Sequence, residues 1–171
     1  MAAHAQITFG TSTRTFEDHG SGVFSNGGIS GETLVYDAAN DNWVYTQTDG
    51  TIVRFPGGTL NIDYYNTALS IEAPDGLKTE IHVDGHLQSV TNNAGYQLKF
   101  QYSSLPELIG VTAINRAVDY CDPMGVSCSA SPGAQSVTYT HTFGEHSLIP
   151  INTTVIDALG RSTRWTNTQN F

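Results

Sequence analysis

Two clusters of histidine and acidic side chains have the residue types that bind metal ions. They are His82, Asp84 and His86 in the first cluster, and His141, Glu145 and His146 in the second. A zinc site needs four ligands at a suitable spacing, and neither cluster has a fourth ligand nearby in the sequence. Asp84-Gly85 also predicts a turn between the two histidines of the first cluster. We therefore expect surface histidines at both places, and we predict neither a metal ion nor a cofactor.

Asp119 and Asp122, which lie close to Tyr120, are the candidates for acid–base chemistry. Glycoside hydrolases use two carboxyl groups held about 5–10 Å apart across a cleft. A sequence does not specify that distance, and a chain with 16 acidic residues has pairs this close together by chance. The sequence contains no G-x-S-x-G motif of a nucleophile elbow. We predict no catalytic residue, and a small hydrolase with a carboxylate pair is the least favoured function.

Cys121 and Cys128 flank the short segment DPMGVS. A disulfide between them would close a small loop in an oxidising compartment. A metal site would need two more ligands at suitable spacing, and the neighbouring sequence has none. We predict the disulfide Cys121–Cys128, with two free thiols as the alternative.

Several aromatic residues lie in segments with strand character and are candidates for stacking on sugar rings. We select Trp43, Tyr65, Tyr96 and Trp165 as ligand-stacking residues. Aromatic side chains of β-sheets are mostly core residues or cross-strand partners, so this assignment competes with a structural role. Carbohydrate binding or adhesion through exposed aromatics is therefore the alternative function.

The elements that position these residues are clearest in the segment from Pro74 to Tyr102. Apolar and polar residues alternate there with a period of two, which predicts strands with one covered face and one wet face. Asp84-Gly85 and residues 92–95 predict turns between the strands. In the last strand, Tyr96, Leu98, Phe100 and Tyr102 share one face, and Lys99 lies on the other. Turns about every ten residues leave no room for crossover helices, so neighbouring strands are predicted to be antiparallel.

The remaining segments repeat this unit with variations. Residues 6–16 are predicted as one strand broken at Gly10, and residues 108–113 and 117–120 as two separate strands. No segment has a convincing helical pattern. The predicted fold class is all-β, with antiparallel hairpin repeats that form a curled or spiral sheet, either open and barrel-like or sandwich-like.

Length and composition agree with one β-rich domain. The chain has 171 residues, of which 13% are charged and 17 are glycine. We assign residues 6–171 to a single β-repeat domain and residues 1–5 to a leader or tag remnant. Ala3-His4-Ala5 resembles the end of a signal peptide, although the apolar core of such a peptide is missing.

The net charge of −9 excludes some classes of partner. Seven basic residues form no basic patch for a nucleic-acid backbone or an anionic lipid surface. No apolar run approaches the roughly 18 residues of a membrane-spanning segment. The acidic balance is typical of a secreted protein that is kept soluble by like charge.

Four segments form a loose repeat. They are TQTDGTIVRF, EAPDGLKTEI, TNNAGYQLKF and IDALGRSTRW, with turn glycines at positions 50, 76, 95 and 160. Each has a turn ending in glycine, then polar or mixed positions, then an apolar or aromatic end. The interval of 19 residues between Gly76 and Gly95 indicates a period of about 20 residues, which predicts one hairpin per repeat.

In these repeats the chain resembles the RHS/YD-repeat family of bacterial proteins. The matching segments are residues 33–55, 84–102 and 154–166, and residues 111–123 (VTAINRAVDYCDP) are also similar. The resemblance implies a hairpin sheet that spirals into a shell around a toxin or effector. The family's self-cleaving Asp-Pro-Gly segment has no clear counterpart, since residues 122–125 (DPMG) lack its surrounding pattern, so that activity is not carried over.

From these observations we expect a non-catalytic β-repeat module of a shell or surface protein. Its role would be toxin or effector encapsulation, or cell-surface interaction, in a secreted or cell-surface location on a bacterium. Its expected partners are further repeats of the same protein, or a second copy paired through edge strands, with a protein cargo or a glycan as additional partners. Unpaired edges of such a fragment favour this association.

Overall fold

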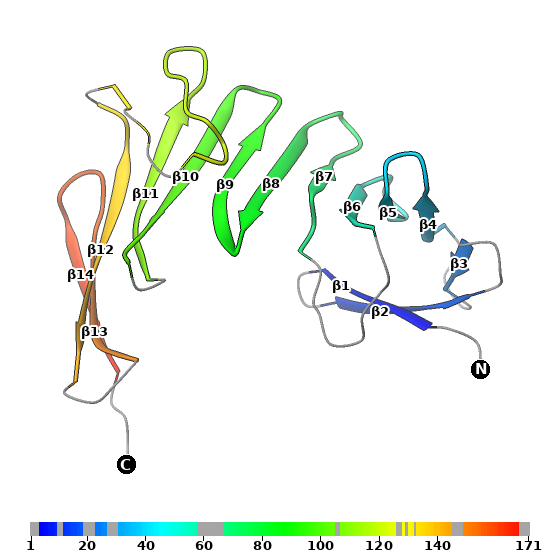
Figure 1. The fold of residues 1–171 in the computed structure, drawn as a ribbon, viewed down its shortest axis with the longest axis horizontal. Coiled ribbons are helices and arrows are strands. Elements are labelled where there is room, and N and C mark those ends of the chain that lie inside the picture. Colours follow the sequence, from blue (N-terminus) through cyan, green and yellow to red (C-terminus); the bar gives the residue numbers. More distant parts are fainter. Residues whose placement is uncertain are drawn as a thin grey trace. The chain divides into compact units, whose positions relative to one another are not determined.

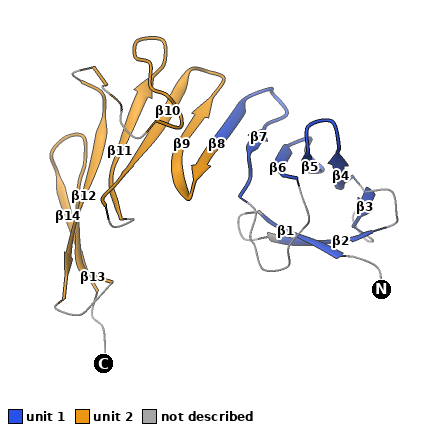
Figure 2. Ribbon diagram, in the orientation of Figure 1, with its two compact units in different colours: residues 1–81 blue, residues 82–171 orange. Residues whose placement is uncertain are grey.

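In a computed structural model, the described residues form fourteen strands and no helix. The residues described are 4–9, 12–18, 23–26, 31–57, 67–104, 107–125, 128, 130–131, 133–144 and 149–167. They divide into two compact units, residues 1–81 and 82–171, and the boundary falls inside the eighth strand (Figure 2).

Unit 1 contains the first seven strands and the beginning of the eighth, in chain order (Figure 1). They are β1 (His4–Phe9), β2 (Ser12–Asp18), β3 (Val23–Ser25), β4 (Thr33–Asp37), β5 (Asn42–Thr46), β6 (Ile52–Pro56), β7 (Ser70–Glu72) and β8 (Lys78–Asp84). Each pairs antiparallel with the next.

Unit 2 contains the end of β8 and six further strands. They are β9 (His86–Asn92), β10 (Tyr96–Tyr102), β11 (Leu108–Asn115), β12 (Ser136–Phe143), β13 (Pro150–Ile156) and β14 (Ser162–Thr166). From β9 onward each strand pairs antiparallel with the next. The all-β, antiparallel hairpin class is thus confirmed. In the described part of unit 2 no pairing joins β14 back to β9, so the sheet is open and does not close into a barrel.

Two of the predicted turns use the same local chemistry. Asp49 and Asp75 each accept a hydrogen bond from the backbone N–H two residues later, at 2.8 Å and 3.0 Å. The glycine that follows each aspartate has a positive φ of 89° or 84°, a conformation that glycine adopts without steric strain. Asp-Gly pairs therefore set the register of the hairpins β5–β6 and β7–β8, as the sequence indicates.

Two of the predicted strands are wrong. Residues 6–16 do not form one broken strand, because β1 and β2 are antiparallel and place Ala5 opposite Phe16. This reversal brings the apolar residues of both strands to one face. Residues 117–120 are not a strand, because the Asn115 side chain accepts a hydrogen bond from the Ala117 N–H at 3.0 Å and starts a turn.

Unit 1 has a hydrophobic core between two parts of its sheet. The Phe16 ring in β2 meets the Tyr45 ring in β5 edge to face, with ring centroids 5.7 Å apart. Figure 1 shows β1 and β2 crossing beneath the strands that follow. The buried residues of the core are Ala5, Ile7, Phe16, Phe24, Leu34, Tyr45 and Val53. The β1–β2 hairpin thus covers the apolar face of β4–β6. His4 and Ala5, which fall in the expected leader, lie in β1.

Unit 2 buries the opposite kind of face. In β10, Gln97 and Lys99 are only 2% and 1% exposed, whereas Tyr96 and Leu98 are 58% and 43% exposed. The predicted alternation is correct, but the covered side is the polar one. The reason is that the segment between β11 and β12 folds back over the polar side. We call the polar side of β9–β11 the covered face and the apolar side of unit 2 the open face.

Candidate functional site

The covered face of unit 2 contains a buried amine. Lys99 in β10 and its cross-strand partner Ser89 in β9 are 1% and 0% exposed. Both donate hydrogen bonds to one oxygen, the carbonyl of Pro123, from the Ser89 Oγ at 2.8 Å and from the Lys99 Nζ at 3.0 Å. Burial lowers the pKa of Lys99, and the negative charge of Asp122 opposes that effect. The described residues form no ion pair with Lys99, so its closest polar partner is this carbonyl.

Gln97 extends this polar cluster along β10. It lies two residues before Lys99, so both side chains project from the same face of the sheet. Neither its Oε1 nor its Nε2 has a hydrogen-bond partner among the described residues. A buried polar group without a partner costs about 1–3 kcal/mol of stability. The covered face is thus stabilised less by burial than an apolar face of the same size would be.

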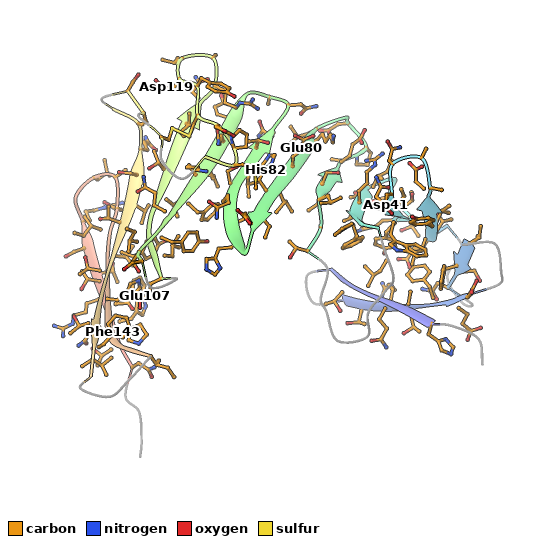
Figure 3. The ribbon with its side chains drawn as sticks, viewed as in Figure 1. Asp41, Glu80, His82, Glu107, Asp119 and Phe143 are labelled. Atoms are coloured by element: carbon orange, nitrogen blue, oxygen red, sulfur yellow. A yellow bond between two sulfur atoms is a disulfide. The ribbon has the colours of Figure 1, made fainter. Side chains whose placement is uncertain are left out.

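The described part of the connection between β11 and β12 (residues 116–125, 128, 130–131 and 133–135), which we call the cover loop, supplies the Pro123 carbonyl. Near its base, Asp119 accepts hydrogen bonds from the N–H and the hydroxyl of Ser131. Further out, a disulfide joins Cys121 and Cys128, whose Cα atoms are 5.4 Å apart. Figure 3 labels Asp119 on this loop, beyond the end of β11. The Asp119–Ser131 hydrogen bonds and the disulfide thus each connect the chain before Pro123 to the chain after it.

A tight turn directs the inner part of the cover loop at the sheet. The Met124 N–H donates to the Asp122 side chain at 2.9 Å, and the Gly125 N–H donates to the Asp122 carbonyl at 3.1 Å. Cys121 is 2% exposed, so the loop packs its sulfur inward, while Cys128 is only half-buried. As a result the Pro123 carbonyl points toward Ser89 and Lys99.

The open face of unit 2 is a second candidate surface. The register of β9–β14 assigns to it no Asp, Glu, Lys or Arg among the strand positions described. Two of its aromatic residues, Tyr96 and Trp165, are 58% and 56% exposed. The face includes Val90, Tyr96, Leu98, Phe100, Val111, Ala113, Val137, Tyr139, Val155 and Trp165. It is an uncharged surface with large apolar side chains in contact with solvent.

The four residues selected for ligand stacking do not come together. Trp43 is half-buried in unit 1, where its ring packs against Phe24 with centroids 5.3 Å apart. Tyr65 lies outside the described residues. Tyr96 and Trp165 share the open face, but β11, β12 and β13 lie between their strands. Four spacings of about 4.8 Å separate their strands, and the register places Trp165 eight residues further along the strand direction than Tyr96. Their backbones are therefore separated by about 19 Å across the strands and by about 27 Å along them.

The three histidines of the two clusters that the structure describes, His82, His86 and His141, have structural partners. The His82 ring nitrogen is 3.0 Å from the Thr91 hydroxyl, and the His86 ring packs against Tyr102. His141 contacts the Leu108 carbonyl at 2.8 Å, and Glu145 and His146 lie outside the described residues. In the described ranges, no three His, Cys, Asp or Glu side chains are grouped so as to hold a metal ion.

The comparisons with known proteins give no match to a protein-family model, a curated protein or a solved structure. In the part of the chain that the structure describes, no helix has the length and apolar character of a membrane span.

The sequence reading missed the Ser89–Lys99–Pro123 cluster. The available signal was Lys99 between Gln97 and Gln101, three polar side chains on the same side of a strand. That pattern is typical of a solvent-exposed face. Gln97 and Lys99 are buried because the cover loop packs over this face of the sheet.

Proposed function

We propose that this chain is a non-catalytic β-hairpin repeat module that packs against further hairpins of its own kind. The observation that carries the proposal is the open face, where Tyr96, Leu98 and Trp165 are exposed and none of the described segments covers them. In unit 1 a face of the same alternating pattern is covered by the β1–β2 hairpin of the chain itself. The role is that of a repeat in a shell or surface protein, as the likeness to RHS/YD repeats implies.

Charge favours a second copy of this chain as the partner of the open face. The chain carries a net charge of −9, so two copies repel one another over most of their surfaces. The open face lacks carboxylates among its described strand positions, so it can meet another copy without placing like charges in contact. Exposed apolar patches on a soluble protein commonly mark such contacts.

The exposed strand β14 supports the same role. All five of its residues are exposed, and in the described structure it pairs with β13 alone. A strand with one unpaired edge is a template for another strand, which is how a further repeat would continue the sheet. The Cys121–Cys128 disulfide supports a secreted or cell-surface location, because such bonds persist in oxidising compartments.

A pair of matched variants tests the proposal. We expect the wild-type chain to self-associate as its concentration rises in sedimentation experiments. Leu98→Asp places a charge on the open face and should weaken association at least about tenfold, or 1.4 kcal/mol. Leu159→Asp, in the exposed β13–β14 turn, is the control and should leave association unchanged. A wild-type chain that stays monomeric at high concentration would refute the proposal.

The exposure of Tyr96 and Trp165 favours carbohydrate binding as the second candidate. Their separation of more than about 19 Å is too large for a single sugar ring and would require an extended oligosaccharide. A glycan array identifies the ligand, and quenching of Trp165 fluorescence that Tyr96→Ala weakens would support this function. A blank array together with unchanged fluorescence would exclude it.

A further inference from the structure

We propose that the cover loop is a redox-sensitive lid over an oxyanion site formed by Ser89 and Lys99. In the oxidised protein the Cys121–Cys128 disulfide holds the loop closed, and the Pro123 carbonyl occupies the site. Reduction of the disulfide releases the loop and exposes both donors to solvent.

The chemistry of the covered face is the first reason for this inference. Closing the loop removes an ammonium group and an amide from water, and both groups lose hydration in doing so. Gln97 gains no hydrogen bond within the described protein, and Lys99 gains a carbonyl instead of a carboxylate. Burial of these two polar groups therefore adds little stability to the closed loop. The Cys121–Cys128 disulfide restricts the conformations of the loop, and this restriction compensates for the small stabilisation from burial.

The position of the two cysteines is the second reason. Cys128 is half-buried and Cys121 is almost fully buried, so an external thiolate reaches the Cys128 sulfur more readily. Attack there breaks the S–S bond, releases Cys121 as a thiolate and forms a mixed disulfide with Cys128. The second thiol of a dithiol reductant then displaces Cys128. The protein gains two electrons and two protons as thiols, and the dithiol is oxidised to its own disulfide.

The geometry of the donors indicates the class of ligand. The Ser89 hydroxyl and the Lys99 ammonium converge on a single oxygen, at 2.8 Å and 3.0 Å. Hydrogen bonds from a charged donor are strongest when the acceptor is also charged, as in a carboxylate or phosphate oxygen. Once the Pro123 carbonyl leaves, these two groups are placed to take such an oxygen in its stead.

Acetylation of lysine amines by an N-hydroxysuccinimide ester measures whether the lid opens. The chain contains only two lysines, Lys78 and Lys99, so the partly exposed Lys78 is an internal control in every sample. We expect Lys99 to react at least about tenfold more slowly than Lys78 in the oxidised protein, because a tenfold difference requires only 1.4 kcal/mol of protection. Dithiothreitol should raise the Lys99/Lys78 ratio toward one, and reoxidation should lower it again.

Two results would refute the proposal that the cover loop is a redox-sensitive lid. One is a Lys99/Lys78 ratio that reduction leaves unchanged. The other is loss of the β-sheet circular dichroism signal on reduction, because the disulfide would then hold the sheet rather than the loop. The variant Cys121→Ser with Cys128→Ser repeats the test without reductant and should behave as the reduced protein does.

Inorganic phosphate tests the ligand class separately. In the reduced protein, phosphate should slow acetylation of Lys99 but not of Lys78, compared with sodium chloride at the same ionic strength. Equal rates in the two salts would refute the oxyanion site. A lid that opens without phosphate protection would leave Lys99 as an exposed amine only.

Discussion

The two units bury opposite faces of their sheets. Both are antiparallel meanders in which apolar and polar side chains alternate. Unit 1 covers its apolar face with the β1–β2 hairpin and buries Phe16, Tyr45 and Val53. Unit 2 covers its polar face with the cover loop and leaves its apolar face open. The difference shows that alternation fixes which residues share a face, whereas the connections between strands decide which face is buried.

The two units also differ in net charge. Residues 1–81 contain ten acidic and three basic residues, and residues 82–171 contain six and four, so the formal charges of −7 and −2 give the total of −9. Unit 1, which has a closed core, carries most of the net charge. Unit 2, which has the open face, is nearly neutral. A nearly neutral unit with an exposed apolar face is the part suited to contact another protein.

Truncation of the unit 1 core should have the largest effect on stability. Phe16 is fully buried, so Phe16→Ala should lower the free energy of unfolding by about 3–5 kcal/mol. Hydrogen exchange followed by mass spectrometry should show lost protection in β4–β6 and retained protection in β9–β11. Thr15→Ala, at the exposed neighbouring position, is the control. An equal loss of protection in both units would contradict their separate packing.

Replacement of the buried amine of unit 2, unlike truncation of the unit 1 core, should not destabilise the protein. Lys99→Met removes a charge that burial disfavours, and the Pro123 carbonyl keeps Ser89 as a donor. We therefore expect no loss of stability near neutral pH, although the side chain is as buried as the core residues of unit 1. Denaturation midpoints of Lys99→Met and of the surface control Lys78→Met measure this. A large loss in Lys99→Met would mean that the Lys99–Pro123 bond stabilises unit 2.

The pH dependence of the free energy of unfolding should show the contribution of Lys99. Its pKa is lowered from the ordinary value of 10.5, so the folded protein binds fewer protons than the unfolded chain below that value. Stability should therefore rise with pH over the alkaline range below 10.5. Lys99→Met should flatten this rise. Above this range the raised pKa of Tyr102, caused by its burial, opposes the trend.

Much of the local structure could be predicted from the sequence. The Asp49-Gly50 and Asp75-Gly76 turns and the alternation in β10 depend on neighbouring residues, and these predictions are correct. The identity of the covered face was not predictable, because it depends on a contact between Ser89 and Pro123, which are 34 residues apart. The error at residues 117–120 hid the cover loop, since a strand predicted there leaves too little chain to fold back over β10.

Removal of an ion pair should produce the smallest difference in stability between the two units. In unit 1, Arg14 contacts Glu32 at 3.3 Å, and the Glu32 side chain is only 7% exposed. Arg14→Gln leaves that carboxylate buried without its cation, so the free energy of unfolding should fall by about 1 kcal/mol. In unit 2, Arg161 pairs with Asp157 at 2.7 Å, but the arginine side chain is 75% exposed.

Arg161→Gln should therefore leave the urea midpoint unchanged, because solvent screens an exposed pair. The backbone N–H groups of Leu159 and Arg161 also continue to donate to the Asp157 carboxylate after the substitution. If Arg161→Gln destabilised the chain as much as Arg14→Gln does, the β13–β14 turn would depend on its ion pair. The contrast between a unit stabilised by buried contacts and a unit with an exposed sheet would then not extend to their charged residues.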